Sequence, residues 1–267
     1  MAIERLSGAD DPRVAEYTSV PDAKLVRERG LFVAEGRFVV RRLIEDGRYR
    51  IRSLLLSDAA LRSLEPVIDG VDASIYVCAA DDFLGITGYH IHRGCLALAE
   101  RPLPSSADDV LAAAGKAIVL EAIANPDNVG GVFRNAAAFG VDAVLLSPSC
   151  CDPLYRKAIR TSMAATLRVP YATLHDWPVA LSDVRRLGFT IVALTPREPS
   201  EDLEEFARRH GSGRLALLVG SEGSGLSPEA DRLADHRVRI PISAQVDSLN
   251  VAVAAGIAMY RLVSTAG

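Results

Sequence analysis

The chain has 267 residues, of which 49% are hydrophobic and 24% charged, and its formal net charge is −4. This composition is typical of a globular protein of one large domain or two modest ones, and it excludes a low-complexity chain. No apolar run reaches the roughly 18 residues of a membrane span and the first 20 residues lack a signal-peptide core, so we expect a cytoplasmic protein with no membrane partner. The four cysteines show no CxxC spacing and no cluster with histidine, so we expect reduced thiols and no metal site.

The first hundred residues predict a small α/β module. Its expected helix covers 36–46 and has Phe38, Val39, Leu43 and Ile44 on one side. Its expected strands are 31–34, 51–56, 74–78 and 95–99.

A segment rich in proline and serine, 101–108, is the best candidate for a linker, because it follows one strand-like run and precedes another. We therefore divide the chain into an N-terminal domain, 1–105, and a C-terminal domain, 106–267.

The C-terminal part alternates apolar strands with helices, which predicts an α/β fold with a parallel sheet covered on both faces. The expected strands are 117–123, 143–146, 189–194, 214–219 and 238–240, and the expected helices are 129–139, 154–166, 177–187, 228–234 and 248–263. Ligands bind such sheets beyond the carboxyl ends of the strands. The last helix is small or apolar all round, which fits a packed core helix, a subunit interface, or both.

Three segments rich in Asn, Gly or Ser follow these strand ends, at 125–131, 220–225 and 241–248. The first runs into a helix on which Arg134 is surrounded by apolar residues, and an arginine there costs solvation unless an anion meets it. The second holds one acid, Glu222, among glycines, and then begins a helix at Ser227. It is neither a P-loop nor a nucleophile elbow, because the required spacings are absent. In the third, Ser248 or Asp247 is expected to cap the final helix.

Basic residues gather in two stretches despite the negative net charge. Residues 24–52 carry nine Lys or Arg against four acids. A second run has no acid between 153 and 175 and contains Arg156, Lys157, Arg160 and Arg168. Each alone is most simply a solvated face, but two such stretches favour a polyanionic partner.

Taken together, the three segments resemble the SpoU (TrmH-like) family of RNA 2′-O-ribose methyltransferases, within the SPOUT superfamily. The matching motifs are N-P-x-N-x-G-x-x-x-R-N-A at 125–136, L-L-V-G-S-E-G-x-G-L-S at 217–227 and I-P-I-x-x-x-x-x-S-L-N-V-A at 240–252. Segments 32–36 and 88–94 also resemble the family's N-terminal module, which has an L30e-like fold. The chain departs from the family at two positions. Ala164 stands where many members have glycine, and Arg93 stands where many have glutamine.

The resemblance implies a deep trefoil knot in the C-terminal domain that binds S-adenosylmethionine. The cofactor contacts that it implies, made largely by the backbone, fall on Leu194, Thr195, Gly220, Ile240 and Leu249. The catalytic group that it implies is Asn128, Arg134, Glu222, Ser248 and Asn250.

Arg134 would be the general base in proposals for the family, but a guanidinium is effectively never deprotonated in proteins. Our hypothesis is that Arg134 binds an RNA phosphate bidentately. Glu222 would then hold Arg134 or Asn128, and Ser248 and Asn250 would orient the ribose hydroxyl.

RNA is the expected partner, with large-subunit ribosomal RNA the first candidate, and the family's homodimers imply a dimer here. The residues expected to contact RNA are Arg37, Arg41, Arg42, Arg93 and Arg160. A tRNA target, or a ribosomal methylation that confers antibiotic resistance, stays open. The alternatives of another class are a non-catalytic RNA-binding or assembly factor and a doubly wound NAD enzyme, and the second lacks an early GxGxxG.

Overall fold

The computed structural model describes residues 3–6, 8, 11–18, 21–88, 94–210, 213–243 and 245–263. The chain forms two compact units. Unit 1 is Met1–Leu103 together with Asp152–Leu167, and unit 2 is Pro104–Cys151 together with Arg168–Gly267. Because the chain returns to unit 1 at Asp152, the single division expected between 105 and 106 did not anticipate the composition of unit 1.

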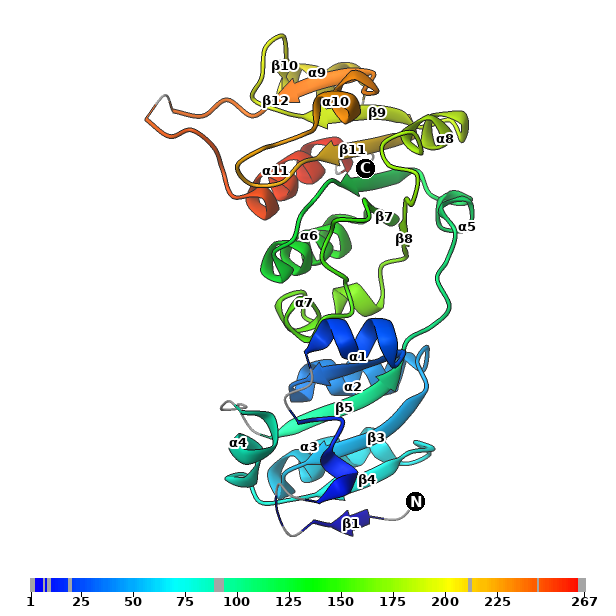
Figure 1. Cartoon of the computed structure of the whole chain (residues 1–267). Helices are drawn as coiled ribbons and strands as arrows, with labels where there is room; N and C mark the ends of the chain where they lie inside the picture. Colours follow the sequence, from blue (N-terminus) through cyan, green and yellow to red (C-terminus); the bar gives the residue numbers. More distant parts are fainter. Residues whose placement is uncertain are drawn as a thin grey trace. The chain divides into compact units, whose positions relative to one another are not determined.

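Unit 1 contains a mixed five-stranded sheet in the order β1-β4-β3-β5-β2, in which β5 runs antiparallel to its neighbours β3 and β2 (Figure 1). The strands are β1 Ile3–Arg5, β2 Leu31–Glu35, β3 Ile51–Leu56, β4 Ser74–Val77 and β5 Cys95–Glu100. The helices of its first segment are η1 Pro12–Val14, α1 Asp22–Glu28, α2 Arg37–Asp46, α3 Asp58–Ile68 and α4 Asp82–Thr87. The four strands and the helix expected here are confirmed to within one or two residues.

One apolar core cluster of unit 1 includes the buried Tyr17, whose hydroxyl donates to the backbone carbonyl of Ser53 at 2.9 Å. Helix α2 begins after Gly36, which adopts φ 98°, and it ends at the left-handed Gly47. Val39 and Leu43 are buried as expected, but Phe38 is 44% exposed. The prediction that Phe38 shares the buried side was therefore wrong: its ring lies under the Arg42 guanidinium, 5.0 Å from ring centroid to Cζ.

The returning segment of unit 1 holds α7 Arg156–Thr161 and η2 Ala165–Leu167. Asp152 pairs with Arg101 at 2.7 Å, and the carbonyl of Leu167 accepts from the Tyr49 hydroxyl at 3.1 Å. The helix expected over 154–166 is shorter, because Met163 and Ala164 have φ of 53° and 69°. The left-handed conformation at Ala164 is one that glycine adopts without strain, which explains why glycine is common there in the family that the sequence resembles.

Unit 2 is a seven-stranded sheet in the order β10-β12-β9-β11-β6-β7-β8, and every pairing is parallel. The strands are β6 Lys116–Leu120, β7 Ala143–Leu146, β8 Tyr171–Thr173, β9 Thr190–Leu194, β10 Glu201–Asp202, β11 Leu215–Val219 and β12 His236–Arg239. The helices are α5 Ala107–Leu111, α6 Pro126–Phe139, α8 Leu181–Arg186, α9 Leu203–His210, α10 Pro228–Arg232 and α11 Val251–Val263. The parallel α/β sheet is as predicted, but β8, β10, α5 and α9 were missed.

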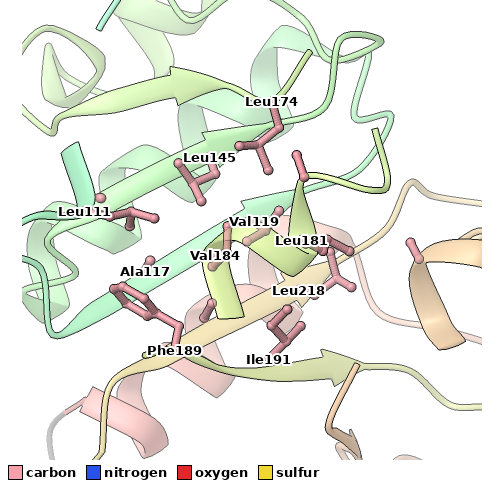
Figure 2. Packing of buried hydrophobic residues seen from close by; sticks show 14 of the residues in the cluster. Leu111, Ala117, Val119, Leu145, Leu174, Leu181, Val184, Phe189, Ile191 and Leu218 are labelled. Carbon is pink, nitrogen blue, oxygen red and sulfur yellow. The ribbon is translucent and has the colours of Figure 1, made fainter. Parts of the chain in front are cut away.

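One apolar core of unit 2 lies where the central strands meet α8. Figure 2 shows Val119 and Leu218, from neighbouring strands, next to Leu181 and Val184 of α8. Helix α11 packs against α6, α9 and β11. Within the described residues, no helix is both long enough and apolar enough to cross a membrane.

Candidate functional site

A cleft of about 400 Å³ opens in unit 2 where β9, β11 and β12 end at their carboxyl sides. This is the edge at which parallel α/β sheets bind ligands. All five positions expected to hold a cofactor line the cleft: Leu194, Thr195, Gly220, Ile240 and Leu249. They come from three segments that are far apart in sequence, at the end of β9, after β11 and after β12.

The loop after β11 forms one wall of this cleft, and it requires glycine. A Cβ at Gly220 would lie 2.3 Å from the carbonyl carbon of Gly225, so no side chain fits there. Gly223 and Gly225 have φ of 99° and 68°, and the Gly225 amide donates to the Ser221 carbonyl at 3.0 Å. The loop therefore turns back on itself and presents backbone to the cleft.

Three predicted catalytic residues meet in a hydrogen-bonded triangle beside the cleft. The Asn128 amide donates to Glu222 Oε2 at 2.6 Å, and the Asn250 amide donates to Glu222 Oε1 at 2.7 Å. The Asn250 amide also lies 3.0 Å from Asn128 Oδ1. Asn128 is buried, and Glu222 lines the cleft. Of the two partners considered for Glu222, the structure pairs it with Asn128 and not with Arg134.

Helix positions set two corners of the triangle. The Asn125 side chain accepts from the Asp127 amide at 2.9 Å, so α6 begins there and places Asn128 in its first turn. The Asn250 Oδ1 accepts from the amides of Ala252 and Val253 at 3.0 and 3.2 Å. Asn250 therefore caps α11, and the expectation that Ser248 or Asp247 does so was wrong.

Ser248 and Arg134 lie outside this triangle. Ser248 is exposed and lines the cleft. Arg134 is exposed on α6, and no described residue forms a hydrogen bond or an ion pair with it. The solvation cost expected for this guanidinium does not arise, because Arg134 is exposed to solvent. The same exposure leaves Arg134 accessible to a phosphate.

A buried carboxylate that the sequence analysis missed secures the loop after β11. Glu121 is 5% exposed and follows β6. Its Oε1 accepts from Trp177 Nε1 at 2.8 Å and from the Ser227 hydroxyl at 2.6 Å, and its Oε2 accepts from the Ser227 amide at 2.9 Å. An acid at the end of an apolar strand is the signal that could have found it.

The residues expected to contact RNA that the structure describes lie in unit 1. Arg41 donates to the Ser63 carbonyl at 2.6 Å, and exposed Arg160 pairs with buried Glu35 at 3.1 Å. Arg42 stacks on Phe38, as described above. The Nε of Arg37 is buried, and none of the described residues accepts a hydrogen bond from it. Arg93 lies outside the described residues.

Among the residues that the structure describes, no group of three or more His, Cys, Asp or Glu side chains could hold a metal ion.

The fold and the site together define an α/β protein whose parallel sheet carries a cleft at the carboxyl ends of its strands. Residues 115–260 match the model of the SpoU rRNA methylase family. The chain belongs to that family.

Two proteins of similar sequence match the chain over both of its units. The chain is 40% identical over 265 residues to an uncharacterised tRNA/rRNA methyltransferase of Mycobacterium tuberculosis (strain ATCC 25618 / H37Rv), covering 97% of this chain and 91% of the relative. It is 24% identical to the 23S rRNA (guanosine(2553)-2′-O)-methyltransferase of Bacillus subtilis (strain 168), covering 97% and 99% of the two chains.

A solved structure shows the same fold. It is the AdoMet-bound rRNA methyltransferase from Sinorhizobium meliloti, with a TM-score of 0.85, 22% identity and 99% coverage of each chain. The expected family and the α/β architecture are thus confirmed.

Proposed function

We propose that this protein transfers a methyl group from S-adenosylmethionine to a ribose 2′-hydroxyl of RNA, with large-subunit ribosomal RNA as its substrate. The observation that carries the proposal is the Asn128–Glu222–Asn250 triangle, which joins the first turn of α6, the loop after β11 and the segment before α11 beside the cleft. Membership of the SpoU family supports the reaction. The relative that acts on 23S rRNA supports ribosomal RNA over tRNA.

The cleft fits S-adenosylmethionine in size and in lining. Ligand sites have volumes of roughly 300–1,000 Å³, and this cleft has about 400 Å³. Leu194, Thr195, Gly220, Ile240 and Leu249 would hold the cofactor, mainly through backbone groups. When bound, the cofactor supplies an electrophilic methyl group on a sulfonium.

The residues around the cleft would position the nucleophile. Arg134, exposed and without a carboxylate partner among the described residues, would grip the phosphate next to the target ribose with two parallel hydrogen bonds. Ser248 would orient the 2′-hydroxyl, which passes its proton to a phosphate oxygen or to water. Asn250, expected to share this role, instead uses its amide to hold Glu222 and Asn128 and its Oδ1 to cap α11. Much of the rate would then come from the alignment of the reacting groups.

The Arg134→Lys variant tests this role, because lysine keeps the positive charge but cannot donate two parallel hydrogen bonds to one phosphate. We expect Arg134→Lys to lower the single-turnover methylation rate about tenfold or more. Retention of most of the rate would exclude a bidentate clamp.

The RNA would lie along the basic surface of unit 1 that contains Arg37, Arg41, Arg42 and Arg160, with Arg93 as a further candidate contact. Single-stranded loops are the expected targets, since a ribose must be splayed out to reach a cleft.

A homodimer and the trefoil knot remain parts of this proposal. One face of α11 carries Val253, Ile257 and Tyr260, which are 51%, 39% and 52% exposed. These residues recur at helical spacing, and an apolar stripe of this kind favours a second copy as the partner. Light scattering at micromolar concentration tests the dimer, and a monomer would contradict it.

Mapping 2′-O-methyl groups on RNA from cells with and without the gene tests the proposed substrate. A mark lost from large-subunit ribosomal RNA supports the proposal. A mark lost from tRNA supports the runner-up substrate, while no lost mark favours a non-catalytic assembly factor. Resistance to ribosome-targeting antibiotics, compared in the same two strains, separates a resistance role from a housekeeping one.

A further inference from the structure

Arg197 lines the cofactor cleft three residues after the end of β9. Its Nη1 donates to the Leu226 carbonyl at 3.0 Å, and its Nη2 donates to the Ser224 carbonyl at 2.8 Å. Both acceptors belong to the glycine loop after β11. The guanidinium is therefore held in place by two neutral groups, and neither cancels its charge.

The charge of Arg197 has no carboxylate partner in the described part of the chain. Its neighbour Glu198 pairs instead with Arg239. Two hydrogen bonds use two of the five N–H donors of a guanidinium, so three remain. A fixed cation with free donors at the wall of a cleft is suited to bind an anion.

The residues that line the cleft include one basic side chain, Arg197, and two acidic ones, Glu222 and Asp247. S-adenosylmethionine has one anionic group, its α-carboxylate, and two cationic ones, its ammonium and its sulfonium. The cleft thus presents the complement of the cofactor's charges. The carboxylate is the group of this ligand that a guanidinium attracts.

We propose that Arg197 binds the α-carboxylate of the cofactor and so selects ligands that carry an intact amino-acid end. This assignment rests on the proposed function, since it takes S-adenosylmethionine as the ligand. Arg197 would hold the carboxylate with N–H groups that its two loop carbonyls leave free. The hydrogen bonds to these carbonyls would keep the guanidinium in position to meet the carboxylate.

Arg197 could instead serve only to tie the loop after β9 to the glycine loop. A tie of that kind would affect every ligand of the cleft equally. A carboxylate contact affects only ligands that have the carboxylate. 5′-Methylthioadenosine, which keeps the adenosine and lacks the amino-acid end, separates the two roles.

The test is calorimetric binding of S-adenosylmethionine, S-adenosylhomocysteine and 5′-methylthioadenosine to the full chain. For Arg197→Gln we expect the affinity for the first two ligands to fall about tenfold or more, with little change for the third. Arg185→Gln is the matched control: Arg185 also donates to a backbone carbonyl, that of Leu233, and does not line the cleft. An equal loss for all three ligands, or no loss for any, would overturn the assignment.

The wild-type protein gives a second test that needs no variant. We expect decarboxylated S-adenosylmethionine to bind about tenfold more weakly than the intact cofactor, and equal affinity would overturn the assignment. A wild-type protein that binds S-adenosylmethionine while Arg197→Gln binds it equally well would sink this inference alone. A wild-type protein that fails to bind the cofactor would contradict the proposed function and, with it, this assignment.

Discussion

The amide of Asn250 donates to the carboxylate of Glu222 at 2.7 Å, although one residue precedes α11 and the other lies in the loop after β11. The other oxygen of the same carboxylate accepts from Asn128 in the first turn of α6. A single acid thus fixes the relative positions of three segments: the start of α6, the loop after β11 and the start of α11. Glu222 suits this position because an ionised carboxylate has two acceptor oxygens and no donor, and each oxygen here accepts from an amide.

Glu222→Gln should disrupt this arrangement with little change in size. A glutamine presents one acceptor oxygen and one NH₂ group, so the NH₂ group would face an amide donor of Asn128 or Asn250. We expect the single-turnover methylation rate to fall about tenfold or more. Glu229→Gln on α10 is the control, since Glu229 is exposed and outside the cleft. Equal rates for the two variants would refute the role of Glu222.

Asn250 has two functions that substitutions can separate. Asn250→Ala removes the cap of α11, so we expect the free energy of unfolding to fall by about 1 kcal/mol in urea titrations. Asn250→Ser keeps a good capping oxygen but is too short to bridge to Glu222 and Asn128. The serine variant should therefore keep its stability and lose methylation rate. A serine variant as active as wild type would show that the bridge is dispensable.

Close approach of α6 and α11 holds the two asparagines together. A Cβ at Gly131 would lie 2.8 Å from the Cβ of Ala252, so the helices cannot accept one without moving apart. We expect Gly131→Ala to lower the free energy of unfolding by about 1–3 kcal/mol. Gly115→Ala is the control, because its nearest neighbour would be 3.8 Å away. Similar midpoints of unfolding for both variants would argue against tight packing here.

Charge reversal on α2 tests the RNA surface of unit 1. Arg41→Glu combined with Arg42→Glu should weaken RNA binding measured by filter retention and flatten its dependence on salt, because phosphate contacts release counterions. Cofactor affinity should not change, since neither residue lines the cofactor cleft. If RNA affinity stays at the wild-type level, α2 is not part of the footprint.

The buried thiols predict how stability depends on pH. Burial raises the pKa of both Cys78 and Cys95 to about 12, and it also raises the pKa of Cys150. Unfolded thiols ionise near about 8.5, so the unfolded state loses protons first as the pH rises. The stability that these thiols contribute is therefore complete below about pH 8.5 and is lost progressively toward pH 12.

Iodoacetamide labelling followed by mass spectrometry checks this directly, because the thiolate is the reactive form. At pH 8 the native protein should resist labelling, and after denaturation in guanidinium all four cysteines should react. Rapid native labelling of Cys78 or Cys95 would contradict the burial described here.

Apolar strands were the most predictable elements. The expected bounds 51–56 and 143–146 coincide with β3 and β7, because a fully buried strand is a continuous apolar run between turn residues. β8 and β10 have three and two residues, too few to establish a period, so their pairing partners decide their structure. The segment Asp152–Leu167 could not be assigned to unit 1 from sequence, because its contacts there, such as Arg160 with Glu35, are long-range.

The sequence predicted which segments form the site, but not the hydrogen bonds between them. Resemblance to the family pointed to the five cleft residues and to the members of the triangle, although which of them bond to one another depends on tertiary structure. The cap at Asn250 was missed because several polar residues precede α11 and any of them satisfies the same local rule. No sequence pattern pointed to Arg197 as a site residue, because the groups it binds are backbone carbonyls 27 and 29 residues away.

The most direct test of the central claim is to identify the methylated nucleoside. The purified protein is incubated with S-adenosylmethionine carrying a labelled methyl group and with ribosomal RNA from cells that lack the gene, and the RNA is then digested to nucleosides for mass spectrometry. The account predicts that the label lies on a ribose 2′-oxygen and that Glu222→Gln yields about tenfold less of this nucleoside, or lower still, at matched early times. A label on a base, or no transfer to RNA by a protein that binds the cofactor, would contradict it.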